Sequence, residues 1–512
     1  MFVFELITIR LVHKLAFAAV VGILSKWFYG RRRERQEQEA FARLNGCLPP
    51  QSEFKHHWPW ALDLIKRHVE TVLTDHALAL QVEFTETLGI TFAAYMFGCV
   101  GYFTSDPRNI EAITNSRFQD IGLGCRRPAC YPFLGEGIFT QDGPPWKHSR
   151  EMLRRQFARV QARDLETFTE QVEILVSTFR NAKGVVDLQP AFFRFTLATS
   201  TALLFGESIE TLSRNEQKEF AEHFDRASRI TAVRLPLADL CFLYNTWAYR
   251  KSCKIVKRYA DYFVKRALRH SEDHGYEEAS EKYAFILDLY NDYKDPTLVR
   301  DQLVNVLLAG RDTTACTMSW TIFHLVRYPD KLKRLREEIM AAAGAQTLIT
   351  RAHTRNMPYL TAVLNEILRL YPQVPMNTRS AIRTTLLPKG GGPDGEAPVL
   401  VPRKAGITFS PYHMHRRKEL FGADANEFRP ERWLDGSLSN IGYAYMPFLH
   451  GYRTCLGKDF ALSEASYGIV RLLQAYPSLR LPPDAVVEPT GQEKQMLTLV
   501  VSSLEGCKVV LD

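Results

Sequence analysis

The strongest constraint on the fold of this chain is one long, unbroken helical pattern. It runs from Arg300 to Tyr328, in the letters RDQLVNVLLAGRDTTACTMSWTIFHLVRY. At about 1.5 Å per residue, a helix of this length crosses a whole domain. Helical periodicity also dominates the wider stretch from about residue 145 to residue 369. The sequence therefore predicts a mainly helical domain with one long central helix.

Strand-forming segments are short and come mostly after the helices. Residues 384–410 alternate turns with short β-rich runs, and residues 101–107, GYFTSDP, have the content and turn ending of a strand. The glycines at 390–392 lack the order G-x-G-x-x-G and no helix follows them, so we predict a hairpin loop there. With no βαβ rhythm, the predicted fold class is mainly α with a small β part added late (α+β).

Composition narrows the classes of function. A chain of 512 residues permits about two to four domains by length alone. The net charge of +8, mixed in sign, does not indicate nucleic-acid binding and fits an anionic membrane surface or an acidic protein partner better. Nine cysteines, scattered without C-x-x-C pairs, indicate reduced thiols in a domain that faces the cytosol.

The first residues form a separate, apolar region. The run LAFAAVVGILSKWFYG (15–30) precedes the basic cluster RRRER (31–35), as expected of an uncleaved membrane anchor with Trp27 and Tyr29 at the interface. The run is shorter than the roughly 20 residues of a spanning helix, so Lys14 would have to snorkel. A helix lying in the membrane interface is the alternative. A cleaved signal is disfavoured, because no A-x-A-like site is evident.

The predicted division of the chain has three parts. These are a membrane anchor over residues 1–30, a basic and proline-containing linker over residues 31–60, and one large domain over residues 61–512.

Cys455 lies in the stretch FLHGYRTCLG, from Phe448 to Gly457. Its nearest cysteines along the chain, Cys316 and Cys507, are too distant in sequence to suggest a local disulfide or zinc site. A phosphatase-type nucleophile would need an arginine six positions on, where the chain has Ala461. A buried inert thiol, a triad nucleophile without a local signature, and a ligand presented to a large group remain open.

The residues around Cys455 favour a ligand. Gly451 and Gly457 allow tight turns and the close approach of a flat surface. A helix predicted directly after the cysteine would bring its N-terminal amides near the sulfur and favour a thiolate. An axial thiolate with Arg453 two residues earlier suits iron in a porphyrin, whose propionates need a cation.

The spacing F-x-x-G-x-R-x-C-x-G resembles the heme loop of the cytochrome P-450 superfamily, in which a cysteine thiolate ligates heme iron. The resemblance implies that Cys455 is the axial ligand of the heme iron. It also implies that Phe448 and Arg453 contact the cofactor.

Two motifs earlier in the chain resemble the same family. EILR places Glu366 and Arg369 on one helix face, and FRPERW adds Arg432. An isolated E-x-x-R is usually a solvated salt bridge. In this order before the cysteine loop, the resemblance implies a buried structural network that holds the loop under the heme.

The segment AGRDTT (309–314) lies in the predicted central helix. Small Ala309 and Gly310 leave room on the helix surface beside Asp312 and Thr313. The plain interpretation is a polar patch with Thr313 bonded back to a carbonyl. In the family this pattern lies over the iron, where the alcohol orients dioxygen and the acid relays protons. Arg311 is expected to point elsewhere and to be structural.

Further cofactor contacts follow from the resemblance. Trp146 and Arg150, in WKHSR, share a helix face and match the family's propionate-binding helix, and Arg379, in VPMNTR, matches another propionate contact. His415 is expected to support the fold rather than to bind iron.

From about Leu88 onward the chain is most similar to the fungal microsomal alkane and fatty-acid hydroxylases, which oxidise chain ends. Those relatives generally carry two glycines and a proline where this chain has Leu449, His450 and Tyr452. These departures leave thiolate ligation intact but bear on hydrogen bonding around the sulfur.

The resemblance implies an enzyme that inserts one oxygen atom of O2 into an unactivated C–H bond, with terminal hydroxylation of a long alkane or fatty acid favoured. The alternatives are a tailoring enzyme of secondary metabolism that hydroxylates a polyketide or terpenoid, a non-catalytic heme sensor or carrier, and an isomerase that needs no external electrons. A substrate carboxylate would have two candidate partners, although a solvated charge pair is the favoured interpretation of both. The predicted pocket residues are Arg126, Arg127, Val304, Leu308, Val374 and Met376.

The implied cofactor is heme b, with O2 as co-substrate. Because no flavin or nicotinamide domain is visible, electrons would come from NADPH through a separate cytochrome P-450 reductase, with cytochrome b5 as a further candidate partner. Membrane lipid is the other expected partner, at the endoplasmic reticulum. A basic docking face is expected at Lys147, Arg154, Arg155 and Lys458.

Overall fold

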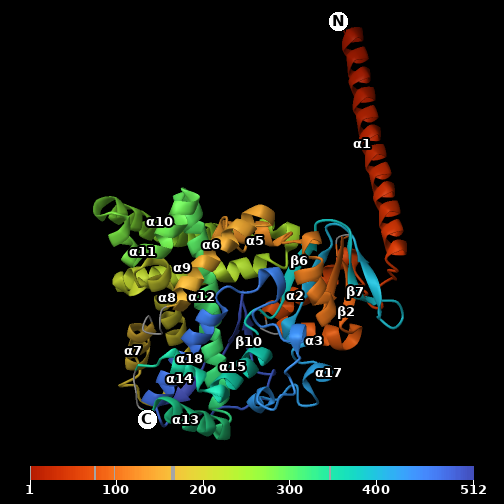
Figure 1. Ribbon diagram of the computed structural model, residues 1–512. Helices are drawn as coiled ribbons and strands as arrows, with labels where there is room; N and C mark the ends of the chain where they lie inside the picture. The colour runs from red at the N-terminus through yellow and green to blue at the C-terminus, as the bar shows by residue number, and fades with distance from the viewer. Residues whose placement is uncertain (1, 74–76, 97–98, 163–167, 345–347, 512) are drawn as a thin grey trace.

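The computed structural model describes residues 2–73, 77–96, 99–162, 168–344 and 348–511 (Figure 1). Helices fill one side of the molecule, and a small sheet with its covering loops fills the other. This arrangement confirms the predicted mainly helical class with a small β part.

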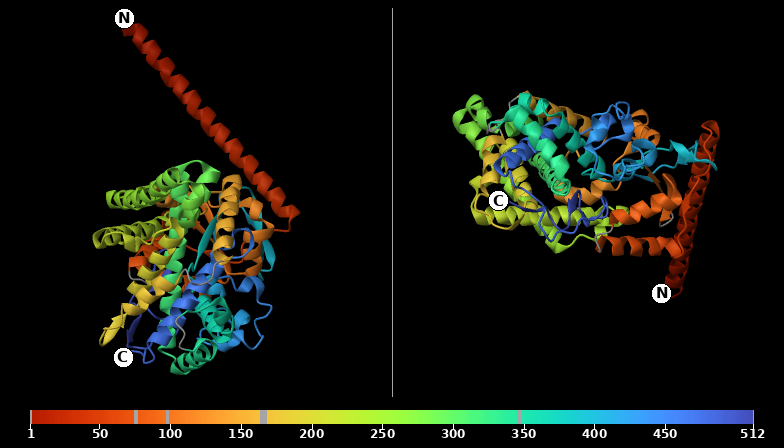
Figure 2. Two further views of the ribbon diagram at one scale, coloured as in Figure 1. Left: turned by 60° about the vertical axis from the view of Figure 1, so that its left-hand side comes forward. Right: turned by 90° about the horizontal axis from the view of Figure 1, so that it is seen from below.

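The first helix, α1 (Phe2–Leu44), projects away from the rest of the chain (Figures 1 and 2). It continues without a break through the basic cluster at residues 31–35, so helix geometry does not change at residue 30. Apolar side chains such as Phe17 and Ile23 are exposed along it. Within the part of the chain that the structure describes, none of the helices combines enough length with enough apolar character to span a bilayer.

The helical side is built around α12 (Pro296–Leu325), which starts earlier than predicted because Asp295 caps its first turn by accepting a hydrogen bond from the Thr297 N–H. Most side chains of α12 are buried, as expected for a helix surrounded by other helices. Helices α8, α10 and α18 pack along it. The remaining helices of this side are α5 (Arg126–Leu134), α6 (Gly143–Ala162), α7 (Thr169–Ser177), α8 (Gln189–Phe205), α9 (Arg214–Arg234), α10 (Trp247–His274), α11 (Tyr276–Tyr293), α13 (Pro329–Ala343), α14 (Arg351–Arg355), α15 (Pro358–Leu370) and α18 (Lys458–Ala475).

Short helices accompany the sheet side. They are α2 (Leu62–Leu73), α3 (Ala77–Leu88), α4 (Pro107–Glu111), α16 (Pro411–Met414) and α17 (Lys418–Phe421).

The main sheet has six strands in the order β1-β2-β3-β9-β6-β4. The prediction that the sheet is added late is wrong in part, because the early strands supply four of the six positions and β3 pairs in parallel with the late strand β9. β1 and β4 are only two residues long, too short for a periodic signal. The strand bounds are β1 (Glu53–Phe54), β2 (Thr91–Met96), β3 (Cys99–Thr104), β4 (Ile121–Gly122), β6 (Asn377–Ala381) and β9 (Gly406–Phe409).

The glycine-rich hairpin is confirmed. β7 (Thr385–Gly391) and β8 (Ala397–Val401) pair antiparallel, with an irregularity between Leu387 and Gly391. Two further pairs join β10 (Gln495–Leu497) to β11 (Val501–Ser503), and β5 (Val185–Asp187) to β12 (Lys508–Val510).

Two hydrophobic cores meet at the predicted cysteine loop. The large core fills the helical side, and a smaller one lies between the sheet and nearby loops. Met446, just before the loop, belongs to the smaller core, whereas Phe460, just after it, belongs to the large one. The loop of residues 448–457 therefore crosses from one core to the other.

Candidate active site

The cysteine loop is closed by its own backbone. The Cys455 N–H donates to the Phe448 carbonyl at 2.9 Å, and Thr454 Oγ1 donates to the Gly451 carbonyl at 2.7 Å. Gly451 has φ +71°, and a Cβ there would lie 2.1 Å from the Thr114 carbonyl oxygen, so this position requires glycine. Helix α18 begins at Lys458, and its free N–H groups therefore lie close to Cys455.

The Cys455 side chain is exposed, yet the surrounding protein raises the pKa of its thiol by desolvation. The Gly457 N–H, the Arg150 guanidinium and Lys458 act in the opposite direction. Coordination to a metal cation would hold the Cys455 sulfur as a thiolate.

A cluster of guanidinium groups lies beside the loop. Arg379, on β6, is buried and donates to neutral acceptors, the Asn377 side chain and the Thr378 carbonyl. Desolvation, together with the charges of Arg126 and Arg453, lowers the pKa of Arg379 well below its usual value.

Arg453 belongs to the same cluster. Desolvation lowers its pKa to about 10, with Arg126 and Arg150 adding to the fall and Asp142 opposing it. Arg453 Nη2 lies 2.6 Å from Asp142 Oδ1. One carboxylate thus faces several mutually repelling cations, and an anionic ligand with two carboxylates would neutralise them.

Trp146 supports this cluster from α6. It is buried, with the Arg453 guanidinium 4.3 Å and the Arg150 guanidinium 5.8 Å from the ring centroid. Phe118 packs against the same ring, with centroids 5.3 Å apart. Stacking of this kind fixes the direction of each guanidinium.

These residues fit a heme. The donor set is one accessible sulfur at a helix N-terminus, a glycine that permits close backbone approach, and guanidiniums short of carboxylate partners. In the described ranges, His, Cys, Asp and Glu side chains form no group of three or more that would hold a bare metal ion. One thiolate on iron that a porphyrin already holds agrees with this arrangement.

The residues of the E-x-x-R motif form one buried network. Arg369 Nε and Nη2 donate to the two carboxylate oxygens of Glu366 at 2.8 Å each, and Arg432 Nε donates to Glu366 Oε1 at 3.0 Å. The Trp433 indole N–H donates to Oε2 at 3.0 Å and the Arg429 backbone N–H to Oε1 at 2.9 Å.

His415 connects this network to the cysteine loop. Its Nδ1 lies 3.2 Å from the Arg369 carbonyl, and its Nε2 accepts a hydrogen bond of 3.0 Å from the Met446 N–H. Burial lowers the pKa of His415 to about 3, so the ring is neutral. Because Met446 lies two residues before Phe448, the first residue of the loop, the network fixes where the loop starts.

On α12, Thr313 Oγ1 donates to the Ala309 carbonyl at 2.7 Å, the back-bonded geometry common in helices. Burial raises the pKa of Asp312 to about 6, with Arg311 opposing the rise and Asp225 adding to it. The space beside Gly310 is taken by α8, since a Cβ there would lie 2.7 Å from Ser200 Oγ.

The expectation that Arg311 points elsewhere is wrong. Its guanidinium is buried and ion-paired with both Asp312, at 3.1 Å, and Asp225 of α9. Two acids share this cation because Arg311 is long enough to reach across the interface between α12 and α9. The sequence placed Arg311 next to Asp312, but nothing in it indicated a partner 86 positions earlier.

A second group that the sequence reasoning missed is Glu464 of α18. It is fully buried, Thr199 donates to its Oε1, and its Oε2 has no hydrogen-bond partner among the described residues. Burial raises its pKa to about 8, opposed by Thr199 and Thr314. The sequence shows this glutamate in the segment ALSEASY, but the burial of a single acidic residue cannot be predicted from the sequence alone.

The predicted pocket residues have different surroundings. Val304 and Leu308 are buried on α12, Met376 is partly buried, and Val374 is 41% exposed. Arg127 is ion-paired with Glu136, as a surface charge pair would be.

Arg126 and Arg127 contact different groups. Arg126 Nη1 donates to Asn377 Oδ1 at 3.3 Å, and its charge acts on Arg379 and Arg453. It therefore belongs to the guanidinium cluster, and the two arginines do not form one carboxylate site.

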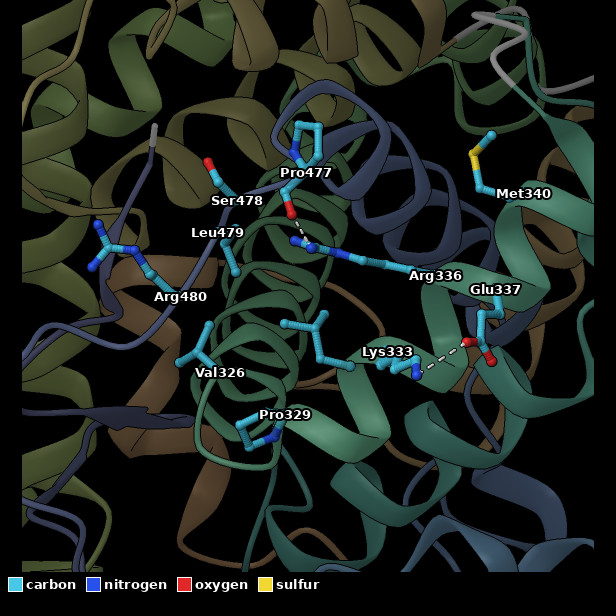
Figure 3. A pocket seen from close by; sticks show the side chains of 11 residues that line it. Val326, Pro329, Lys333, Arg336, Glu337, Met340, Pro477, Ser478, Leu479 and Arg480 are labelled. Carbon is cyan, nitrogen blue, oxygen red and sulfur yellow. Dashed lines mark hydrogen bonds and ion pairs between the residues drawn. The ribbon is translucent and has the colours of Figure 1, made fainter.

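A surface cavity of about 520 Å³ lies elsewhere, between α13 and residues 477–480 (Figure 3). Met340, Leu479 and Pro329 line it, and Lys333 pairs with Glu337 at its rim. None of the predicted site residues lines this cavity. It is therefore separate from the cysteine site.

Comparison with known proteins covers the region that carries all these motifs. The cytochrome P450 family model matches residues 56–504. A relative named Cytochrome P450, from Arthroderma benhamiae, is 42% identical over 486 residues, which are 93% of this chain and 94% of the relative. Cytochrome P450 52A5 of Candida maltosa is 38% identical over 489 residues, 91% of each chain. Cytochrome P450 52A6 of Candida tropicalis is 41% identical over 398 residues, 74% of this chain and 76% of the relative.

Proposed function

The chain belongs to the cytochrome P450 family and is a heme-thiolate monooxygenase, and from this premise we propose that it hydroxylates the terminal carbon of a long-chain alkane or fatty acid. Support for the chain-end reaction comes from the similarity to the fungal alkane and fatty-acid hydroxylases over most of the sequence. The apolar side chains of Val304, Leu308, Val374 and Met376 suit an aliphatic chain.

The observation that carries the heme assignment is the accessible Cys455 sulfur beside a cluster of under-compensated guanidiniums. Cys455 would ligate the iron, and Arg150, Arg379 and Arg453 would hold the propionates, with Trp146 fixing their directions. Phe448 would contact the cofactor through the loop that it closes. When bound, the heme supplies activation of O2 and insertion of one oxygen atom, using electrons from NADPH that a separate reductase delivers.

On the other side, we assign proton delivery to Asp312 and Thr313. A carboxyl whose pKa is about 6 holds a proton for part of the time near neutral pH and can release it. Thr313 Oγ1, now bonded to the Ala309 carbonyl, would turn toward the substrate side to pass the proton on.

Glu366, Arg369 and Arg432 have a supporting role in this proposal. Their network, with His415, fixes the start of the cysteine loop and so the position of the sulfur. No proton moves through it.

We also propose that α1 attaches the enzyme to the endoplasmic reticulum membrane, with residues 1–30 as the anchor, residues 31–60 as the linker and the catalytic domain of residues 61–512 in the cytosol. The exposed apolar side chains of α1 and the basic cluster after them support this placement. The reductase, and cytochrome b5, would dock on exposed Lys147, Arg154 and Lys458. Arg155 is less available, because it pairs with Asp292 at 2.7 Å.

The test uses membranes that carry the full chain together with a microsomal reductase and NADPH. A panel of alkanes, fatty acids and terpenoids is supplied, and new hydroxyl groups are located by mass spectrometry. A carbon monoxide spectrum of the reduced protein reports the thiolate-ligated heme, and the Cys455→Ser variant is the control that should lose it.

We expect terminal alcohols or diacids from chain substrates. If no chain substrate is turned over while the spectrum is intact, the chain-end proposal is wrong. Hydroxylation of the terpenoids, or of polyketides supplied next, would then identify an enzyme of secondary metabolism.

A further inference from the structure

Two adjacent residues of α9 contact the segment of α12 to which proton delivery is assigned above. Asp225 accepts a hydrogen bond from Arg311 Nη1, and the Phe224 ring centroid lies 5.2 Å from the same guanidinium. Phe193 of α8 lies at the same distance from that guanidinium. Arg311 is thus held by an acid from α9 and by two rings.

The same nitrogen of Arg311 serves two carboxylates. Nη1 also donates to Asp312 Oδ1 at 3.1 Å, while Arg311 Nε has no partner among the described residues. Both acids therefore compete for one cation. Any movement of Asp225 changes how strongly Arg311 interacts with Asp312.

The two acids differ in their access to water. The Asp225 side chain is 51% exposed, whereas that of Asp312 is 7% exposed. The group that can lose its partner to solvent is therefore the one on α9.

The charges around Asp312 determine in which direction a change at Asp225 shifts the pKa of Asp312. On α12 these are Arg311, which lowers the pKa of Asp312, and the thiol of Cys316, which is neutral because burial raises its pKa well above the usual value. From α9 the charge is Asp225, which raises the pKa of Asp312. From α8 the contacts with Arg311 are uncharged, namely Phe193 and the Thr196 hydroxyl, which donates to the Arg311 carbonyl.

Removing Asp225 would leave Asp312 as the sole acid on Arg311. Asp312 would then be more fully ionised at neutral pH and would donate a proton less often.

The far end of α9 binds a different region. Arg234 is buried, and its guanidinium donates to the carbonyls of Pro128 and Ala129 at 3.1 and 3.0 Å. It also donates to the Cys241 and Tyr244 carbonyls, at 2.8 and 2.7 Å. One helix therefore connects α5, which carries the predicted pocket residues Arg126 and Arg127, with Arg311 and Asp312.

We infer that Asp225 is a positioning residue for oxygen activation: it shares Arg311 with Asp312 and so links the position of α9, and of α5, which α9 holds through Arg234, to proton delivery. This inference rests on the role proposed above for Asp312.

The experiment compares four variants of the full, heme-loaded chain with reductase and NADPH. They are Asp225→Asn, Asp225→Glu, Asp312→Asn and, as the matched control, Glu222→Gln. Glu222 lies one turn earlier on α9, is exposed and pairs only loosely with Lys218, at 3.9 Å. The readouts are product formed per NADPH, hydrogen peroxide released, the pH profile of product formation, and substrate affinity from the spectral shift.

In Asp225→Asn we expect product per NADPH at neutral pH to fall about threefold or more, and the profile to move to lower pH by about one unit, as a charge change at this range predicts. Peroxide release should rise, and substrate affinity should stay the same. Asp225→Glu should recover most of the coupling, because the charge is kept. Glu222→Gln should behave as the unmodified chain.

Two outcomes would overturn the inference. If Asp225→Asn matches Glu222→Gln in coupling and pH profile while Asp312→Asn loses coupling, Asp312 acts without help from α9. If Asp225→Asn lowers heme content and substrate affinity without moving the pH profile, Asp225 is structural. An Asp312→Asn variant with unchanged coupling and profile would instead remove the proposed role of Asp312 itself.

Discussion

Two arginine–carboxylate networks belong to the proposed active site, and they are built differently. On the cysteine side, Glu366 and Arg369 are fully buried, and each oxygen of Glu366 accepts at least two hydrogen bonds. On the α12 side, Asp312 shares one guanidinium nitrogen with the half-exposed Asp225.

The two networks differ in whether their carboxylate is fixed in place or can exchange a proton. A carboxylate that is saturated with donors is fixed in place, because releasing any partner leaves a buried charge unpaired. Asp312, whose pKa burial raises to about 6 and which shares its cation with a second acid, can exchange a proton near neutral pH. In the function proposed above, the first arrangement fixes the cysteine loop and the second supplies protons.

The largest expected effect is in the saturated network. Glu366→Gln leaves Arg369 and Arg432 buried without their carboxylate, so we expect a loss of about 3–5 kcal/mol in the free energy of unfolding and loss of the reduced carbon monoxide spectrum. Thermal unfolding measures the loss of stability, and the carbon monoxide spectrum reports whether the thiolate-ligated heme is lost.

The matched control is Glu337→Gln. Its pair with Lys333 is exposed, at 3.9 Å, and should contribute less than about 1 kcal/mol (Figure 3). Equal effects of the two variants would contradict the distinction between the networks.

The next effect concerns the proton path. Thr313→Ala should keep the heme spectrum and stability but lower product per NADPH about tenfold or more, since a positioned proton donor contributes at least that much. Thr321→Ala is the control, because Thr321 Oγ1 is also back-bonded, to the Thr317 carbonyl at 2.7 Å, and lies two turns further along α12. Full coupling in Thr313→Ala would leave this hydroxyl without the assigned role.

Glu464 sharpens the comparison with Glu366, because it is equally buried but faces hydroxyls instead of guanidiniums. Its pKa, about 8 when folded, is raised above the ordinary value of 4.5. The stability that this group contributes is therefore fully present below pH 4.5 and is lost as the pH rises through about 8.

Between those limits the free energy of unfolding should fall by about 1.4 kcal/mol per pH unit on account of this one proton. Glu464→Gln, which keeps the shape of the neutral acid, should flatten that slope in denaturant titrations at pH 6, 7 and 8. An unchanged slope would mean that Glu464 is ionised in the folded protein.

Short-range patterns in the sequence were enough to predict the first network but not the second. Glu366 and Arg369 are one helical turn apart, and Cys455 lies in a loop whose spacing carries its own signature. Helix α12 was predictable because its helical sequence pattern is long and unbroken. The pairing of Arg311 with Asp225 depends on how α9 packs over α12, and no local pattern encodes that contact.

The prediction of the sheet was wrong in part for a related reason. Residues 121–122 form a strand only because β6 is already beside them. Burial of Glu464 likewise depends on α8 and α12 meeting α18, and an acidic residue on a helix is exposed far more often than buried. Tertiary contacts, which no short stretch of the sequence reveals, determine the Arg311–Asp225 pair, the strand at residues 121–122 and the burial of Glu464.

The smallest expected effect tests whether the cysteine loop is itself strained. Leu449 has φ +58°, a conformation that costs a side-chain-bearing residue roughly 1–2 kcal/mol. Leu449→Gly relieves that cost but frees the unfolded chain and removes a partly buried side chain, so the net change should stay within about 1 kcal/mol.

Lys404→Gly is the matched control, since Lys404 has φ +70° at an exposed turn far along the chain from the loop. Thermal midpoints and the heme reduction potential are measured for both variants. We expect Lys404→Gly to be neutral or slightly stabilising with no change of potential. If Leu449→Gly shifts the potential while the control does not, the leucine sets the hydrogen bonding at the sulfur; if neither shifts it, the saturated network around Glu366 alone is enough to hold the loop.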